Sequence, residues 1–278
     1  MRPATLAASV APVLTGTAIA VHQGGVRWGA GFGALVVGVA MQLGVNFAND
    51  YSDFVRGADA KRTGPLRAAS SGIVAPNQVR AAAIGAFGVA GIVGLLLSLA
   101  VDVRLLVAGA ACLLAGWLYT GGPRPYGYLG LGEVFVFVFF GLIATAGTVY
   151  VETGRVTPLT LLMGCAMGFL ATAILVLNNL RDIETDAAAG KRTLATRIGR
   201  ARTRQLLIGL FVAAFAAAVI AAFFVPFALL VLLALPLAWS AAQVAMTTAD
   251  PRSLVTALKR AAITELVYAL LFAFAMLL

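Results

Sequence analysis

The sequence predicts an all-α integral membrane protein with nine transmembrane helices in a single domain, residues 1–278. The first reason is composition: 61% of the residues are hydrophobic, only 11% are charged, and the mean hydropathy is +0.97, which ordinary soluble domains do not reach. The second reason is that the apolar residues form windows of about 17 to 25, the helix length that crosses a hydrocarbon core. The third reason is that Lys and Arg concentrate in alternate loops.

The nine expected helices follow one another with mostly short connections. We expect the first to be a true transmembrane helix, because no small-residue cleavage pattern follows it and many further spans do. Pro226 in "FFVPFALL" sets the boundary between the seventh and eighth, since it marks a turn or kink in one long apolar stretch. The expected spans are 5–21, 29–48, 80–100, 103–120, 131–151, 158–178, 205–222, 224–246 and 261–278.

The basic residues predict the orientation in the membrane. With the N-terminus inside, the loops at about 49–79 and 179–204 are cytoplasmic and the C-terminus is outside. Only Arg27, Arg104 and Arg155 then lie on the outer side. The net charge of +9 is therefore explained by topology rather than by a nucleic-acid partner. Contact of some basic residues with anionic lipid or with an anionic substrate stays open beside that explanation.

Two polar clusters end even-numbered spans on the predicted cytoplasmic side. In "NFANDYSDFVRGAD", four polar residues stand at i, i+3, i+4 and i+7 and share one helix face; they are Asn46, Asn49, Asp50 and Asp53. In "NNLRDIETD", three residues step by four and Asn179 lies one position off that line; they are Asn178, Asp182 and Asp186. A basic loop containing "KRT" follows each cluster, which suggests that the two halves of the chain are related.

The two clusters fit the coordination chemistry of Mg²⁺. This hard cation takes oxygen ligands, keeps several waters and usually joins one or two carboxylates to substrate phosphates. Two clusters would hold two ions, and the following basic residues could neutralise a diphosphate; these are Lys61, Arg62, Lys191 and Arg192. The alternative is a pair of solvated helix ends, although acids at membrane depth are costly and usually functional. His22, the single histidine, lies on the opposite side, so a histidine-based metal site is excluded.

These motifs resemble those of the UbiA superfamily of intramembrane prenyltransferases, whose signatures are an "NDxxDxxxD"-type motif and a later "DxxxD" motif. The chain has "NDYSDFVRGAD" and "DIETD" at these places. The spacing "NDYxDxxxGxD" resembles the 1,4-dihydroxy-2-naphthoate polyprenyltransferase branch (MenA enzymes). The stretches "YTGGPRPYGYLGLGEVFVFVFFG" and "NNLRDIETDAAAGKRTLATRIGR" agree with that branch, so the resemblance covers nearly the whole chain.

The resemblance implies a fold and an activity. The fold is a ring of nine transmembrane helices around a central cavity, in a bacterial cell membrane, with the loops at about 49–79 and 179–204 capping the active site. The implied reaction moves a polyprenyl group from an allylic polyprenyl diphosphate to 1,4-dihydroxy-2-naphthoate. Carbon dioxide and diphosphate are released, and the product is demethylmenaquinone, in menaquinone biosynthesis.

The resemblance also implies a set of metal ligands. Two Mg²⁺ ions would be bound by Asn49, Asp50, Asp53, Asp182 and Asp186. Asp59 arrives two residues late in the first motif, so whether it reaches the metals or orders the loop stays open. The best candidate cation for the diphosphate is Lys191, followed by Arg62 and Arg67, with topology as the alternative role for each. Further substrate contacts are expected from Asn46, Asn178, Asn179 and Tyr119.

Other residues are expected to serve the acceptor and the allylic cation. Arg124 in "GGPRPYG" could meet the acceptor carboxylate, or could only set topology. We hypothesise that Glu133 positions or deprotonates the acceptor hydroxyl. Ring faces could stabilise the cation, although the same rings could serve packing or face lipid; the candidates are Tyr51, Tyr119, Phe135, Phe137 and Phe139.

Three alternatives compete with this prediction. One is another UbiA branch, with 4-hydroxybenzoate, homogentisate or a tetrapyrrole as acceptor. Another is a cation-coupled membrane transporter, for which paired acids at the membrane midplane are expected; here the acids lie at span ends beside basic loops. The third is an amino-alcohol phosphotransferase, whose "DGxxAR" pattern is missing from the sequence. Prenyl chain length and oligomeric state are not indicated.

Overall fold

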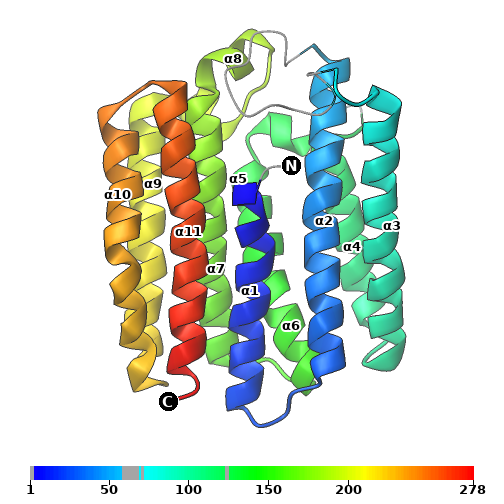
Figure 1. Cartoon of the computed structure of the whole chain (residues 1–278), viewed down its shortest axis with the longest axis vertical. Helices are drawn as coiled ribbons and strands as arrows, with labels where there is room; N and C mark the ends of the chain where they lie inside the picture. Colours follow the sequence, from blue (N-terminus) through cyan, green and yellow to red (C-terminus); the bar gives the residue numbers. More distant parts are fainter. Residues whose placement is uncertain (1–2, 58–68, 70–71, 123–124) are drawn as a thin grey trace.

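Every regular element of the chain that is described here is a helix (Figure 1). The computed structural model describes residues 3–57, 69, 72–122 and 125–278. The predicted all-α class is therefore confirmed for these residues. Four predicted site residues lie outside the described residues; they are Asp59, Arg62, Arg67 and Arg124.

The helices run roughly parallel or antiparallel along the long axis of the molecule (Figure 1). Each expected span coincides with one helix or with a continuous run of helices. In chain order the elements are α1 Pro3–His22, α2 Trp28–Val55, α3 Pro76–Ala100, α4 Leu105–Leu118, η1 Tyr126–Leu129, α5 Gly132–Val136, η2 Phe137–Ile143, α6 Ala144–Thr153, α7 Pro158–Arg181, α8 Ile183–Ala188, α9 Leu194–Ala221, η3 Pro226–Ala234, α10 Leu235–Thr247 and α11 Pro251–Ala275.

Seven helical runs among the described residues are long and apolar enough to cross a membrane. Helix α4 has only 14 residues, and α11 carries Lys259, Arg260 and Glu265 along its length. The chain is thus a multi-pass membrane protein, and the number of nine crossings stays a prediction.

Several helices extend beyond the apolar spans expected from the sequence. Helix α2 continues past residue 48 to Val55, so the first polar cluster forms its last turns. The cause is tertiary, because Ser52 Oγ donates to the Thr120 carbonyl at 2.8 Å and Asp53 is held by neighbouring side chains. Helix α9 begins at Leu194 with a short stretch that Thr193 caps, and a kink at Gly199 separates this stretch from the long helix that contains the span expected from 205. Hydropathy locates the apolar part of a helix, and caps and contacts decide where the helix ends.

A π-helical segment, η2, interrupts the fifth expected span. Here η2 crosses α7 at very short range: a Cβ added to Gly141 would lie 2.2 Å from the Gly168 Cα. Only glycine permits this approach, because any side chain would collide with the facing backbone. Single-turn π segments are often found at functional sites, and this one lies beside the cavity described below.

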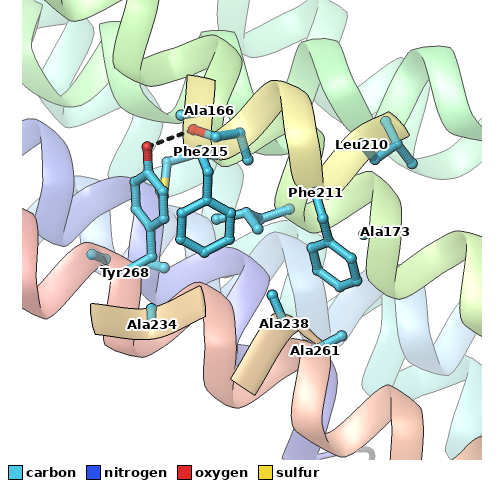
Figure 2. Packing of buried hydrophobic residues seen from close by; sticks show 14 of the residues in the cluster. Ala166, Ala173, Leu210, Phe211, Phe215, Ala234, Ala238, Ala261 and Tyr268 are labelled. Atoms are coloured by element: carbon cyan, nitrogen blue, oxygen red, sulfur yellow. Dashed lines mark hydrogen bonds between the residues drawn. The ribbon is translucent and has the colours of Figure 1, made fainter. Parts of the chain in front are cut away.

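The buried core lies in the C-terminal half of the chain. Figure 2 shows Phe211 and Phe215 of α9 packed among small residues of α7, η3, α10 and α11. The Tyr268 hydroxyl of α11 donates to the Ala214 carbonyl at 2.9 Å, so its polar atom is satisfied inside this core. By contrast, α3 presents many large apolar side chains on the surface, as expected of a lipid-facing helix.

Candidate active site

A large cavity runs between the helices of the N-terminal half in the described part of the chain. It encloses about 290 Å³ and is lined by residues from α1 to α7, with none from α9, η3, α10 or α11. Along α2 its lining extends from Asn49 to Ala34, about 22 Å at 1.5 Å per residue. The cavity therefore reaches from the acidic end of the bundle through most of a membrane's apolar thickness.

The first polar cluster lies at the head of this cavity. Asn46 and Asn49 line it, while Asp50 and Asp53 are only 7% and 2% exposed. The Asn46 side chain donates to Thr5 Oγ1 at 2.9 Å, which joins α2 to α1. Asn49 Oδ1 is buried and accepts no hydrogen bond from the described residues. This oxygen is suited to a ligand, since burying an unsatisfied polar atom is costly.

The second polar cluster begins where α7 ends. Asp182 caps α7 and is buried against the adjacent Arg181. The Arg181 guanidinium donates to the two Asp182 carboxylate oxygens at 2.7 and 2.6 Å and to Asn178 Oδ1 at 2.7 Å. A bidentate pair of this kind fixes both direction and rotamer. Sequence reasoning missed this role of Arg181, because in a basic cytoplasmic segment it reads as one more charge, even though it stands three residues from Asn178 on the same helix.

Lys191 joins the two clusters. Its Nζ lies 2.5 Å from Asp53 Oδ1, and its backbone N–H donates to the Asp186 carbonyl at 2.8 Å. The Lys191 side chain is 12% exposed and that of Asp53 is 3% exposed, so the pair is largely removed from solvent. Residues more than a hundred positions apart in the chain therefore form one charged site.

Tyr128 in η1 is a further site residue that sequence reasoning missed. Its hydroxyl donates to Asp53 Oδ1 at 2.6 Å, and the face of its ring lies 4.6 Å from Lys191 Nζ and 5.0 Å from the Arg56 guanidinium carbon. Burial, and then the charge of Asp53, raise the pKa of the Tyr128 phenol, so it remains a proton donor. No signal in "PYGYLGLG" distinguishes Tyr128 from its neighbours, because the contact depends on how η1 folds across the end of α2.

Glu133 and Asn179 form a buried pair beside the cavity. Asn179 Nδ2 donates to Glu133 Oε1 at 2.9 Å, and the two residues are 8% and 6% exposed. Neither belongs to the cavity lining among the described residues. The structure thus places Glu133 against the end of α7, whereas Asn178, on the neighbouring position, does line the cavity.

Aromatic rings form one wall of the cavity. Tyr119 and Tyr126 meet edge to face at 5.4 Å, Tyr126 and Phe135 stack at 3.9 Å, and Phe135 and Phe139 stack at 5.8 Å between ring centres. All four line the cavity. Phe137 instead contacts Phe169, with 5.0 Å between ring centres.

Three of the five predicted aromatic residues therefore line the cavity. Tyr119, Phe135 and Phe139 do so, whereas Tyr51 and Phe137 are not among its lining residues in the described part of the chain. Phe135 and Phe139 stand four residues apart and so share a helix face, whereas Phe137 lies on another face.

The donor set at the head of the cavity fits Mg²⁺ as a partner of a phosphate ligand. Among the described residues, no three His, Cys, Asp or Glu side chains group closely enough to hold a metal ion by themselves. Mg²⁺ does not need such a cage, since it usually keeps waters and joins one or two carboxylates to phosphates. The side chains that could supply such ligands are the buried Asn49 oxygen and the carboxylates of Asp50, Asp53, Asp182 and Asp186.

None of the charged residues of the two clusters is among the cavity's lining residues in the described part of the chain; the clusters contribute Asn46, Asn49 and Asn178 to it. An apolar, membrane-deep cavity that ends at these asparagines, next in the chain to buried acidic residues, defines a class: intramembrane proteins that bind an amphipathic molecule with a charged head group. The comparisons with known proteins specify this class further. The chain belongs to the UbiA prenyltransferase family, whose model matches residues 9–263. The predicted family is confirmed, and with it the prenyltransferase class of enzyme.

Curated relatives match over most of their length. A 1,4-dihydroxy-2-naphthoate octaprenyltransferase of Mycobacterium tuberculosis is 43% identical over 97% of this chain and 92% of the relative. Proteins of the same name from Mycobacterium leprae and Escherichia coli are 48% and 38% identical, over 76% and 74% of this chain and 72% and 69% of the relatives.

Solved structures share the fold. A UbiA homologue from Archaeoglobus fulgidus, described as bound to GPP and Mg²⁺, aligns with a TM-score of 0.69 at 14% identity, over 99% of this chain and 96% of that chain. The same homologue described as bound to DMAPP and Mg²⁺ aligns with a TM-score of 0.64. These structural similarities show that the chain has the same helical fold as the solved homologue.

Proposed function

We propose that this protein transfers a polyprenyl group from an allylic polyprenyl diphosphate to 1,4-dihydroxy-2-naphthoate, giving demethylmenaquinone in its reduced form. The observation that carries this proposal is the 43% identity to a 1,4-dihydroxy-2-naphthoate octaprenyltransferase over nearly the whole of both chains. The cavity supports it, because a long apolar volume that ends at Asn46, Asn49 and Asn178, next in the chain to the acidic residues, suits a prenyl diphosphate.

The reaction balances without a redox partner. The allylic C–O bond breaks and diphosphate leaves with the electron pair. The ring carbon that bears the carboxylate forms the new C–C bond to the prenyl group. The bond to the carboxylate then breaks, carbon dioxide leaves, and the electron pair returns to the aromatic ring. A hydroxyl proton that leaves during attack is recovered when the ring is restored.

Bound Mg²⁺ would supply electrostatic stabilisation of the charge that develops on the leaving diphosphate. We propose that it binds to Asn49, Asp50, Asp53, Asp182 and Asp186, with two ions as the expected number and Asp59 as a possible further ligand. Lys191 neutralises part of the same charge, while Tyr128 and Arg181 orient Asp53 and Asp182. Asn46 and Asn178 line the passage next to these groups, and Arg62 and Arg67 are proposed as additional diphosphate contacts.

The cavity itself would protect the allylic cation. Its lining is mostly apolar, so water that would quench the cation is excluded, and ring faces of Tyr119, Phe135 and Phe139 are available to stabilise positive charge. We propose Arg124 as the partner of the acceptor carboxylate. Glu133 is proposed as a positioning residue for Asn179 and the end of α7, because its carboxylate accepts the Asn179 amide rather than lining the cavity.

The distribution of Lys and Arg supports an orientation with the acidic end of the bundle in the cytoplasm. In this orientation the loops at about 49–79 and 179–204 cap the site from the cytoplasmic side, and the C-terminus is outside. Helix α8, which contains Asp186 of the second acidic cluster, lies at one end of the bundle, and the C-terminus lies at the other end (Figure 1), as this orientation requires.

The test is a direct choice between acceptors. Protein reconstituted in lipid nanodiscs with Mg²⁺ and octaprenyl diphosphate is given 1,4-dihydroxy-2-naphthoate or 4-hydroxybenzoate, and products are identified by mass spectrometry. We expect the decarboxylated prenyl naphthalenediol from the first acceptor and no prenylated product from the second. Prenylation of 4-hydroxybenzoate alone would contradict the proposal and assign the chain to another branch of the family.

A further inference from the structure

Gln42 is a buried polar side chain that has no role in the site described so far. It lies on α2 one helical turn from Asn46, lines the cavity, and is 6% exposed. Helix α2 approaches α1 closely at two points, one on each side of Gln42 along the helix. Asn46 bonds to Thr5 on the side toward the acidic head, and a Cβ on Gly38 would meet the Ser9 carbonyl at 3.3 Å on the deeper side. Gln42 therefore faces the passage between these two points of contact with α1.

The side-chain amide of Gln42 makes no hydrogen bond within the described part of the chain; Asn49 Oδ1, two turns nearer the acidic end, is likewise unpaired, whereas the hydroxyl groups of the cavity wall named next are paired. Ser9, Ser98 and Thr148 each donate to a carbonyl of their own helix, at 2.9, 2.7 and 2.7 Å. Tyr126 donates to the Ala115 carbonyl at 2.8 Å. Leaving a buried amide without a partner is costly, whereas an apolar residue would cost nothing at this position. The unpaired amide of Gln42 therefore points to a polar ligand group at this depth.

A prenyl diphosphate cannot supply that group. Its polar atoms are all in the diphosphate, which is proposed to bind near Asp50 and Asp53, and Asp50 lies eight residues from Gln42, about 12 Å along the helix axis. The prenyl chain beyond the diphosphate consists of carbon and hydrogen. A hydroxylated aromatic acceptor does have such groups, and a hydroxyl both donates and accepts, which matches the two ends of a primary amide.

We infer that Gln42 binds the acceptor hydroxyl that is further from the prenylated carbon, and so selects a dihydroxylated ring. This inference rests on the proposed function. In 1,4-dihydroxy-2-naphthoate the reacting carbon bears the carboxylate and adjoins the 1-hydroxyl, so the 4-hydroxyl is the group directed away from the diphosphate. The stacked rings of Tyr126 and Phe135 also line this cavity and offer a flat apolar wall for the fused ring.

The test compares two acceptors that differ only in the 4-hydroxyl. Apparent KM is measured for 1,4-dihydroxy-2-naphthoate, and the inhibition constant for 1-hydroxy-2-naphthoate, in the reconstituted wild-type protein and in Gln42→Leu. Wild type should bind the dihydroxy compound about tenfold more tightly than the monohydroxy compound, the loss expected for one hydrogen bond. In Gln42→Leu the ratio of the two affinities, dihydroxy over monohydroxy compound, should fall toward one. The KM for octaprenyl diphosphate should change less than about twofold.

The matched control is Gln23→Leu, the same substitution at an amide outside the cavity lining, where Gln23 donates to Thr157 Oγ1 at 3.3 Å. Its acceptor ratio should equal that of wild type. If Gln42→Leu does not fold, Gln42→Met preserves the side-chain length and removes both hydrogen-bonding groups. Suppose that wild type is active and the Gln42 variant is folded. An unchanged ratio of affinities for the dihydroxy and monohydroxy compounds would then overturn this inference but leave the proposed function standing. A wild type that makes no product from 1,4-dihydroxy-2-naphthoate would overturn the proposed function, and the inference with it.

Discussion

Three side chains fix the acidic residues at the head of the cavity. Arg181 holds Asp182 through a bidentate pair, Lys191 contacts Asp53, and Tyr128 donates to the same carboxylate. Buried carboxylates of this kind need such partners, because an unpaired charge in a poorly hydrated site is costly. The same contacts fix the directions of the Asp53 and Asp182 carboxylates, and fixed ligands are what an enzyme needs in order to bind a metal diphosphate in one geometry.

Tyr128→Phe tests this positioning. The change removes the hydroxyl that bonds to Asp53 but keeps the ring that lies against Lys191 and Arg56. We expect the Mg²⁺ concentration for half-maximal activity to rise about tenfold or more, the range seen when a residue that orients a metal ligand is lost. The midpoint of thermal unfolding should change little. Both are measured on the reconstituted protein.

The matched control is Tyr150→Phe at the opposite end of the bundle, where the Tyr150 hydroxyl donates to Asp102 in the loop between α3 and α4. This variant should keep the wild-type Mg²⁺ dependence. An equal shift in both variants, or none in Tyr128→Phe, would show that Tyr128 does not position the metal ligand.

At the scale of the helices, the crossing of η2 and α7 sets the shape of the aromatic wall. Gly141 and Gly168 let the two backbones touch, and the π segment between Phe137 and Ile143 fits the helix to this contact. The element could be predicted only in part. A transmembrane helix over 131–151 follows from hydropathy, but a π segment leaves no mark in the periodicity of a uniformly apolar stretch. Helical spacing groups Phe135 with Phe139 and separates Phe137 from them, but it does not decide which of the two faces lines the cavity.

Gly141→Ala tests the close crossing. The added Cβ would lie 2.2 Å from the Gly168 Cα, so η2 and α7 must separate. We expect a loss of stability of about 1–3 kcal/mol, as for other overpacked contacts, seen as a lower midpoint in thermal unfolding of the detergent-solubilised protein. Gly147→Ala is the control, because a Cβ there meets no atom within 4 Å; this variant should be as stable as wild type or slightly more stable. Equal midpoints for the two variants would contradict the crossing.

At the scale of the whole molecule, the two halves of the chain have different tasks. The second half supplies α9, η3, α10 and α11, whose small and aromatic residues pack into a solid core (Figure 2). The first half encloses the cavity, and α7 belongs to both. The sequence suggests two related halves from their acidic helix ends, yet the cavity described above is lined by α1 to α7, and α9 to α11 contribute none of its lining residues.

The limits of sequence reasoning at this scale have a physical reason. Both acidic clusters could be found, since Asn and Asp at helical spacing stand out in an apolar chain. Tyr128, Arg181 and Gln42 could not be assigned a role from the same signal. Tyr128 reaches Asp53 only through the fold of a connecting segment, Arg181 reads as another cytoplasmic charge, and Gln42 differs from a packing residue only in what surrounds it.

The central claim is that clusters 132 residues apart, around Asp50 and Asp182, act as one site. The most direct measurement is product formation from octaprenyl diphosphate and 1,4-dihydroxy-2-naphthoate by Asp53→Asn, by Asp182→Asn and by the double variant, each confirmed as folded by thermal unfolding. Each single change should lower the rate by at least about a hundredfold, the scale for loss of one preorganised electrostatic contact. The double variant should fall little further, because residues that act as a unit are not additive. Near-normal turnover in either folded single variant would contradict the claim.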